Sequence, residues 1–369
     1  MKLYHKRVLF LFYCLILVLT VYSFVLIDPN LTLINHNLWA QIKEFFINFG
    51  YLQREKSSRL YLSLVALLFI FYLYFVKHYK KINIVSLIVP LSFLAIFSYP
   101  FLSHDFFNYI FDAKILTYYH KNPYFFKAVD FPQDLWPRFM HWTHRTYPYG
   151  PVFLVLSVIP SFFSLGKFIL NFLFFKAFFC VFYILATYCL YKMNKRYAIV
   201  FAANPLIIIE GLVASHNDLI AVCLAIIGIY YLYRKKDKIS RFFLLASSGI
   251  KYITLPLLFL SRQRNKFGNK INLVVFLGQL AVLFYLCWQL EIQPWYFLSL
   301  FALIPFYEKL IINLNIFFAG LLFAYYPFVR YGDWVNESIK MKHNIIVVFF
   351  IINLGFVIGR ELLRHQKIG

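Results

Sequence analysis

Runs of about twenty apolar residues recur along almost the whole chain, and they constrain the fold more than any other feature. The first covers residues 8–27, two more cover 60–76 and 84–102, and others follow to the end of the sequence. A helix of about twenty residues crosses a bilayer core of about 30 Å. Because 62% of the 369 residues are hydrophobic and only 14% are charged, a sizeable soluble domain is excluded. The sequence predicts an all-α, polytopic transmembrane helix bundle of about 10–12 membrane segments.

Basic residues lie in short segments between the apolar runs. The chain has 37 Lys and Arg against 15 Asp and Glu, which gives a formal net charge of +22. Such a charge can indicate nucleic-acid binding, but clustering beside membrane helices follows the positive-inside rule instead. We therefore expect no nucleic-acid partner, both termini in the cytoplasm, and residues 103–150 outside. The five cysteines lie within apolar runs without metal-ligand spacing, so buried thiols are expected.

These assignments divide the chain into three parts. Residues 1–102 are expected to form a region of three membrane helices, residues 103–150 an external loop, and residues 151–369 the remaining bundle. The loop should hold interfacial helices, because apolar side chains recur at i, i+4 and i+8 beside a polar strip. These apolar residues are Phe107, Phe111 and Ile115, and the strip contains Asn108 and Asp112.

Two apolar stretches do not fit complete crossings. Residues 152–165 are short and interrupted by Pro160, and residues 242–260 have basic residues beyond both ends. We expect both to be half-helices or re-entrant pieces, the second with Gly249 and Lys251 near its tip. Irregular backbone inside a membrane is tolerated where protein buries it or where it lines a cavity.

The external loop is rich in acids for this chain. It holds four of the 15 acidic residues and four histidines, namely Asp105, Asp112, Asp130, Asp134, His104, His120, His141 and His144. Such a concentration favours a functional site. His141 and His144, at i and i+3, are weak candidates for ligating a divalent cation, although loop histidines near lipid headgroups are common.

Five motifs occur in a fixed order along the middle of the chain. They are SHDFFNYIFDAKILTYYHKNPY from 103, TYPYGP from 146, NPLIIIEGLVASHNDLI from 204, SSGIKYITLPLLFL from 247 and QPWYF from 293. In this order they resemble the polytopic GT-C glycosyltransferases. The likeness is greatest to mannosyltransferases that use polyprenyl-phosphate-linked mannose, including the GPI-anchor first-mannosyltransferase type. The resemblance covers residues 103–297.

The resemblance implies a function and a set of site residues. It implies inverting transfer of a hexose, expected to be mannose, from a polyprenyl-phosphate sugar donor to a lipid-linked or glycan acceptor on the extracytoplasmic face. Asp105 matches the family's catalytic acid, Asp218 a second acidic position, and Lys251 the lysine that follows. Asp112 is the third catalytic candidate. The substrate-binding candidates are His104, Tyr109, Asn122, Tyr124, Arg138, Arg145, Tyr149, Glu210, His216, Asn217, Lys251, Gln293, Trp295 and Tyr296.

One departure from the family leaves the cofactor open. The first-loop motif of the family often has two acids close together, whereas here His104 precedes Asp105. A divalent cation is therefore only a candidate cofactor. The protein is expected in the plasma membrane, or in the endoplasmic reticulum if its source is eukaryotic, in contact with membrane lipids.

Glycosyl transfer requires the residue types that the motifs supply. A carboxylate can accept the proton of the acceptor hydroxyl, and positive charge stabilises the departing phosphate. We expect Asp105 and Asp218 to approach each other across one external cavity. Lys251, Arg138 and Arg145 are the candidate phosphate partners.

Structural alternatives remain for these residues. Asp105 can cap the helix that follows it, Asp218 can be a solvated turn residue, and Lys251 can extend its amine to the cytoplasm. The remaining alternatives are a polar helix face for Asp112, the membrane interface for Glu210, and an aromatic belt for Trp295 and Tyr296.

A transporter or lipid flippase is the rival class of protein. Such proteins place charges at mid-membrane on broken helices, often within inverted repeats. The sequence contains no visible inverted repeat. Acids that converge in one external cavity would favour the enzyme, and an acid-lined path through the membrane would favour transport.

Overall fold

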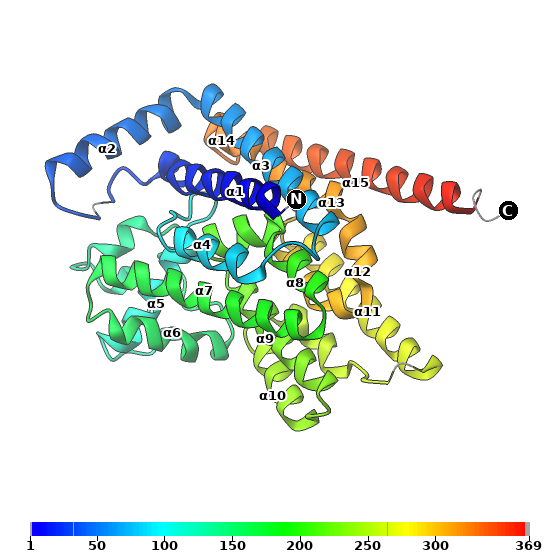
Figure 1. Ribbon diagram of the computed structural model, residues 1–369. Coiled ribbons are helices and arrows are strands. Elements are labelled where there is room, and N and C mark those ends of the chain that lie inside the picture. Colours follow the sequence, from blue (N-terminus) through cyan, green and yellow to red (C-terminus); the bar gives the residue numbers. More distant parts are fainter. Residues whose placement is uncertain (1, 32, 264, 366–369) are drawn as a thin grey trace.

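The computed structural model describes residues 2–31, 33–263 and 265–365 as a bundle of helices (Figure 1). Helix makes up 77% of it, and the described residues contain no β-strand. Six helical segments are long and apolar enough to cross a membrane. They are α1 (Lys2–Tyr22) with η1 (Ser23–Leu26), α3 (Arg54–Lys77), α7 (Phe168–Met193), α11 (Lys266–Gln289), η7 (Pro294–Leu303) with α12 (Ile304–Asn313), and α15 (Asn336–His365). The predicted all-α membrane bundle is confirmed.

Other apolar segments are short or bent. The shorter apolar helices are α4 (Ile84–Ile96), α6 (Pro151–Phe163) and α9 (Asp218–Tyr233). Helix α8 (Lys195–Ala202) and the π-helix η5 (Ile207–Val213) form one possible further span with a 68° bend. Pro205 lies in that bend, and Pro327 lies at the start of the helix that follows the break between α13 (Asn315–Phe323) and α14 (Tyr326–Tyr331). Proline lacks the N–H that a continuous helix needs, so two predicted single spans, 197–213 and 311–328, are each two helices.

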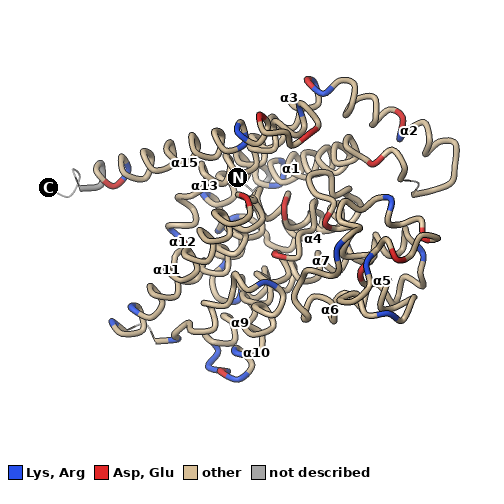
Figure 2. Tube along the Cα trace, turned by 180° about the vertical axis from the view of Figure 1, so that it is seen from behind, with Lys and Arg blue, Asp and Glu red and all other residues tan. Residues whose placement is uncertain are grey.

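Contacts between turns are found at two ends of the bundle. At one end, Lys195 donates to the backbone oxygen of Lys80 at 2.8 Å, and Arg196 pairs with Glu308 at 2.8 Å. The basic turn between α9 and α10 (Asp237–Ser248) also stands out at the edge of the molecule (Figure 2). At the other end, Arg330 pairs with Glu55 at 3.1 Å.

Residues 237–260 fold back on themselves as a helical hairpin. Helix α10 is followed by the 3-10 helix η6 (Tyr252–Phe259). The Arg241 guanidinium on α10 donates to the backbone oxygens of Leu258 and Leu260, so the two open ends of the hairpin lie together. Gly249 and Lys251 lie at the opposite, closed end, as expected for a re-entrant piece.

Helix α5 (Asp105–Thr117) forms where a helix was predicted, but it is enclosed by protein. Every residue from Phe106 to Ile115 is buried, including the polar strip of Asn108 and Asp112. The rest of the loop folds over the helix through η3 (Ala128–Asp130) and η4 (Trp136–Phe139). Its contacts include an ion pair of 2.5 Å between Lys114 and Asp134. The expected exposed polar face is therefore absent, because the loop itself covers it.

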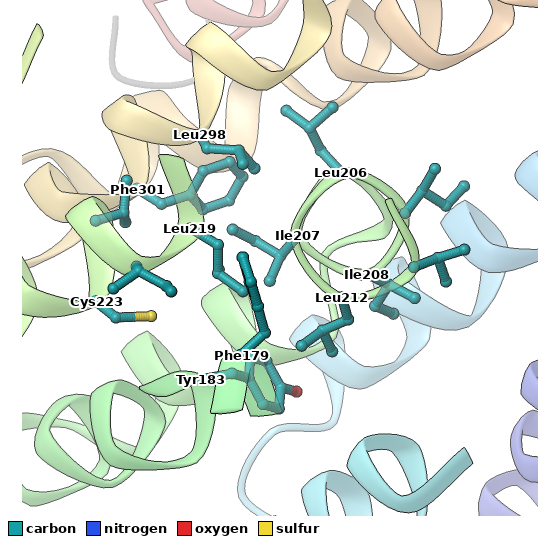
Figure 3. Packing of buried hydrophobic residues seen from close by; sticks show 14 of the residues in the cluster. Phe179, Tyr183, Leu206, Ile207, Ile208, Leu212, Leu219, Cys223, Leu298 and Phe301 are labelled. Atoms are coloured by element: carbon teal, nitrogen blue, oxygen red, sulfur yellow. The ribbon is translucent and has the colours of Figure 1, made fainter. Parts of the chain in front are cut away.

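The core lies around η5. Side chains from α7, α9 and η7 surround this short helix, as Figure 3 shows. They include Phe179 and Tyr183 from α7, Leu219 and Cys223 from α9, and Leu298 and Phe301 from η7. Close packing on all sides fixes the position of η5 and of the turn that follows it.

Two helices lie at the edge of the bundle. Helix α2 (Asn37–Ile47), followed by η2 (Asn48–Leu52), has no buried residue of its own. Helix α15 extends beyond the rest of the molecule (Figure 1), and 11% of its apolar window is buried within the protein. The apolar surface of α15 fits contact with lipid.

Candidate active site

A cavity of about 1010 Å³ lies where the ends of several helices meet. Its walls come from the start of α5, the start of α9, the tip of the α10–η6 hairpin, the start of η7, and α15. The predicted site residues that line it are His104, Asp105, His141, Arg145, Tyr149, Asp218, Lys251, Gln293, Trp295 and Tyr296. The fold thus brings together residues from all five sequence motifs.

Asp105 and Asp218 both line this cavity, but they differ in whether a cation is paired with them. Oδ2 of Asp218 lies 3.1 Å from the ammonium of Lys251, and the Asp218 side chain is 3% exposed. The Asp105 side chain is 21% exposed, and the closest basic atom is Nδ1 of His216 at 3.8 Å, beyond hydrogen-bond distance. Among the described residues no Lys or Arg forms a salt bridge with Asp105. Asp105 is therefore the carboxylate that remains available to a ligand.

The electrostatic surroundings of Asp105 favour proton uptake. Burial raises the pKa of this carboxyl above its ordinary value, and the nearby charge of Asp218 raises it further. The positive charges of Lys251 and Arg145 oppose the shift without cancelling it. A carboxylate with a raised pKa is a stronger base than a solvated aspartate. Asp105 is also the first residue of α5, where the helix dipole favours its ionised form.

His216 lies between two carboxyl groups behind the cavity wall. The ring is fully buried and stacks on Trp295, with ring centroids 4.0 Å apart and an interplanar angle of 17°. Its Nε2 lies 3.4 Å from Glu210, and its Nδ1 faces Asp105. Burial lowers the pKa of His216 far below its ordinary value, so the imidazole is neutral. His216 and Glu210 thus support Trp295 and Asp105 without reaching the cavity.

A buried lysine holds the turn that carries His216 and Asp218. Lys176 on α7 donates to the backbone oxygens of Leu212 and Val213 at 2.8 and 2.7 Å, and to Oγ of Ser215 at 3.0 Å. Ser215 has a left-handed φ of 58°, which costs energy in a residue other than glycine. The sequence interpretation missed Lys176, although a lone basic residue inside an apolar run is a signal of function or pairing.

Some motif residues do not line the cavity but hold its walls in place. Oδ1 of Asn204 accepts from the backbone N–H of Leu206 at 2.9 Å, at the bend that leads into η5. The backbone N–H of Asn217 donates to Oη of Tyr109 at 3.4 Å, which ties α5 to the start of α9. Tyr109 also meets Tyr149 edge to face, with centroids 4.9 Å apart.

The two proline motifs of the external loop bind each other. The backbone N–H of Tyr147 donates to the oxygen of Pro123 at 2.9 Å, and Tyr124 donates its hydroxyl to the backbone oxygen of Tyr149 at 3.1 Å. Asn122 accepts from the backbone N–H of Tyr124 at 3.0 Å and so forms the turn. Asn122 and Tyr124 therefore shape the segment that carries Tyr149, rather than contact a ligand.

A close glycine contact joins this loop to the hairpin tip. A Cβ added to Gly150 would lie 2.0 Å from the backbone oxygen of Gly249. The backbone N–H of Val152 donates to the same oxygen at 3.3 Å. Only glycine allows this approach at position 150, and the contact sets the position of Lys251 two residues further on.

Several predicted residues lie elsewhere. Arg138 is exposed and packs on Phe139, away from the cavity. Asp112 is buried outside the cavity lining, and burial raises its pKa to about 8. Asp134 pairs with Lys114, and Asp130 accepts from the backbone N–H of Lys127 at 2.8 Å. Two of the four loop acids thus serve the fold of the loop, where the sequence pattern suggested a site.

The histidines of the loop do not gather as a metal site. His141 stacks on His104 with centroids 4.0 Å apart, whereas His144 lies against Trp142. Within the described residues, no three His, Cys, Asp or Glu side chains are placed to hold a metal ion. Burial and the neighbouring His141 lower the pKa of His104 to about 4, so this ring is neutral at physiological pH.

The cavity also contains residues that the sequence interpretation did not select. Glu291 and Lys342 line it, together with Trp142, Trp334 and Tyr325. Glu291 stands two residues before the QPWYF motif, and Lys342 stands in a basic cluster just before the last apolar run. Glu291 thus adjoins a motif and Lys342 adjoins a predicted membrane helix. This proximity was the signal in the sequence that could have identified them.

Comparison with known proteins gives one match. A family model described as alpha-(1->6)-mannopyranosyltransferase, N-terminal domain, matches residues 62–261. No curated protein and no solved structure matches the chain. The matched segment includes Asp105, Asp218 and Lys251 and ends before the QPWYF motif.

Proposed function

The chain belongs to the alpha-(1->6)-mannopyranosyltransferase family, and on that premise we propose the reaction that it catalyses. The protein is a multi-pass membrane mannosyltransferase. It transfers a mannosyl residue, with inversion, from a polyprenyl-phosphate donor to a lipid-linked or glycan acceptor. Because the family's description specifies an α-1,6 linkage, the proposed nucleophile is the 6-hydroxyl of an acceptor mannose. The proposed location is the extracytoplasmic face of the plasma membrane, or of the endoplasmic reticulum in a eukaryote.

One observation carries the proposal: an unpaired carboxylate and a held lysine face the same cavity. Asp105 has no Lys or Arg partner within the part of the chain that the structure describes, whereas Lys251 is fixed by Asp218 at 3.1 Å. A transferase needs a base for the acceptor and a cation for the leaving group within one substrate's reach. This arrangement supplies both.

The proposed reaction uses these residues in one displacement. The acceptor 6-oxygen forms a bond to the anomeric carbon while the bond from that carbon to the phosphate oxygen breaks. Asp105 takes the proton of the acceptor hydroxyl. Lys251 stabilises the negative charge that develops on the departing polyprenyl phosphate, and Asp218 keeps the ammonium in place.

Arg145 is the second proposed cation for the phosphate. It lines the cavity, and its guanidinium lies 4.4 Å from the ring centroid of Trp142. A guanidinium can bind phosphate through two hydrogen bonds at once. Arg138, the other basic candidate of the loop, does not line the cavity and takes no part in the proposed reaction.

The apolar part of the cavity suits the lipid tail of the donor. Leu286 and Leu290 line it from the end of α11. Trp288 and Phe284 on the same helix are 76% and 69% exposed, so an apolar surface continues outside the cavity. A polyprenyl chain can follow that surface into the membrane while its phosphate remains beside Lys251.

A transporter or lipid flippase is the alternative to a mannosyltransferase. The broken helices η5 and η6 are features that such a protein would share. However, the acids Asp105 and Asp218 converge in one cavity with Lys251. That convergence favours a site for chemistry over a path for transport.

The test is transfer by the purified protein in nanodiscs. The donors are radiolabelled polyprenyl-phosphate mannose and, as a matched arm, GDP-mannose; the acceptor is octyl α-mannopyranosyl-(1→6)-α-mannopyranoside. We expect a labelled product from the lipid donor alone, and its digestion by an α-1,6-specific mannosidase. Label movement across a sealed bilayer without a glycoside product would support the flippase and contradict the proposal.

The face of the membrane has its own test. In a background without the native cysteines, Lys127→Cys in the external loop should react with an impermeant thiol reagent in intact cells. The matched control, Lys238→Cys at the start of α10, should react only after permeabilisation. Both side chains are exposed. The reverse pattern would place the cavity at the cytoplasmic face.

A further inference from the structure

A second polar group lines the cavity and has no part in the displacement described above. We call it the Glu291 group: Glu291 in the turn between α11 and η7, Gln293 at the start of η7, and Lys342 on α15. Within the described residues, no hydrogen bond or salt bridge joins this group to the two acids and the lysine of the transfer site. The group therefore requires an explanation of its own.

The carboxylate of Glu291 is held at one oxygen and open at the other. Oε1 accepts from Nε2 of His343 at 2.6 Å and from the backbone N–H of Ile292 at 3.1 Å, and it lies 3.6 Å from the ammonium of Lys342. Oε2 takes part in none of these contacts. The side chain is 29% exposed within the cavity wall. One oxygen is thus fixed in place, and the other can accept hydrogen bonds from a ligand.

The ionisation of Glu291 is fixed by its neighbours. Burial alone would raise the pKa of Glu291, but the hydrogen bond from His343 and the charge of Lys342 outweigh it and lower the pKa below the ordinary value. An ionised carboxylate that already has its cations is a strong acceptor for hydroxyl groups. It repels a phosphate.

Lys342 serves this group rather than a separate anion. Its side chain is 5% exposed, and its Nζ lies 3.3 Å from Oε1 of Gln293. It also lies 5.1 Å from the ring centroid of Trp334. With these partners the ammonium fixes both Glu291 and Gln293. The amide nitrogen of Gln293, which takes no part in the contact, remains free to donate to a ligand.

Aromatic rings complete the lining beside this group. Trp334 stacks on Phe328 with an interplanar angle of 7°, and Trp295 and Tyr296 lie in the first turn of η7, just after Gln293 and Pro294. All four rings line the cavity. A few directed polar groups among aromatic faces are typical of a site for a small polar molecule. A sugar ring presents its hydroxyl groups to the polar side chains and its C–H groups to the aromatic rings.

We propose that the Glu291 group is the acceptor subsite and binds the hydroxyl groups of a neutral glycan. Oε2 of Glu291 accepts from sugar hydroxyls, and the amide of Gln293 donates to a sugar oxygen. The proposal rests on the proposed function, because it gives the acceptor its place in the same cavity. A bound acceptor lies between this subsite and Asp105, with its reactive hydroxyl toward the carboxylate. The donor phosphate remains with Lys251 and Arg145.

Binding without donor tests the subsite directly. Purified protein in nanodiscs is titrated with octyl α-mannopyranosyl-(1→6)-α-mannopyranoside by calorimetry, and the KM values for donor and acceptor are measured separately. We expect Glu291→Gln to weaken acceptor binding and raise the acceptor KM by at least about tenfold, the cost of a lost charged hydrogen bond. The donor KM should stay within about twofold, a difference below 0.5 kcal/mol.

Control variants keep the outcome decisive. Glu308→Gln removes a partly buried, paired carboxylate at the other end of the bundle and should leave acceptor binding unchanged. If Glu291→Gln is not monodisperse, Gln293→Ala decides, because it leaves the Glu291–His343 contact in place. Three results would overturn the proposed subsite. The deciding variant could bind the acceptor with wild-type affinity, it could raise the donor KM instead of the acceptor KM, or the wild-type protein could fail to bind the acceptor. Normal binding without any transfer would contradict the proposed function alone.

Discussion

The Lys251–Asp218 pair permits a sharp test, because the proposed role of Asp218 operates through Lys251. Single variants Lys251→Met and Asp218→Asn and the double variant form a thermodynamic cycle. The ammonium and carboxylate lie 3.1 Å apart, with side chains 22% and 3% exposed. Breaking a fully buried pair costs about 3–5 kcal/mol. Since Lys251 is partly exposed, we expect about 2–3 kcal/mol here, with allowance for solvent screening.

In the transfer assay, this loss of free energy is measured as a lower kcat/KM. A loss of about 2–3 kcal/mol in transition-state stabilisation corresponds to roughly a 30- to 150-fold lower kcat/KM. Each single variant should show a loss of this size. The double variant should be no slower than Lys251→Met, because Asp218 has nothing left to position.

The matched control is the exposed pair Arg330–Glu55, also 3.1 Å apart and outside the cavity lining. The same cycle there should leave kcat/KM unchanged and alter stability by at most about 1 kcal/mol. Losses at Lys251 and Asp218 that multiply in the double variant would refute the reasoning. Asp218 would then act on the substrate independently.

Two further predictions concern the base and the glycine contact. The rate should fall as pH drops through the pKa of Asp105, because the base must be ionised. Burial raises that pKa, so the fall in the pH–rate profile should lie above the pKa of a free aspartate; a fall at or below the free value would contradict the role of Asp105. Gly150→Ala places a Cβ 2.0 Å from the backbone oxygen of Gly249, so it should destabilise the protein by about 1–3 kcal/mol and lower the transfer rate. A normal melting temperature and a normal transfer rate would show that the external loop and the tip of the α10–η6 hairpin do not need this contact.

The membrane helix bundle could be predicted because each membrane helix is specified by its own local sequence. Apolar runs of sufficient length specify membrane helices whatever they pack against. The irregular helices were not predictable in this way. Residues 295–308 were expected as one span, and Pro294–Asn313 is long and apolar enough to be one, but its first ten residues, Pro294–Leu303, form a 3-10 helix. Its backbone is determined by packing against η5 and α9, which no local pattern records.

The candidate site was predictable to the extent that motif residues meet in space. Asp105, Asp218 and Lys251 line one cavity although they come from three separate motifs. Motif order could not separate residues that face the cavity from residues that hold its wall. His216 and Tyr109 are in the second set, because a supporting side chain and a binding side chain look alike in sequence.

The Glu291 group was missed for a different reason. Lys342 is 49 positions from Gln293, and His343 is 52 positions from Glu291. Separately, these residues look like the charged flanks of membrane helices. Only the packing of α15 beside the start of η7 shows that they form one group.

The central claim is that Asp105 is the base for mannosyl transfer. Turnover of the Asp105→Asn variant at saturating donor, with monodisperse protein in nanodiscs, tests it most directly. Asparagine keeps the shape of the side chain at the first residue of α5, but it lacks basicity. Our account predicts a loss of at least about 10²-fold with lipid-donor binding retained. Turnover above about a tenth of the wild-type value would be too high for the loss of a general base. It would contradict the account and leave Asp105 a structural role at the start of α5.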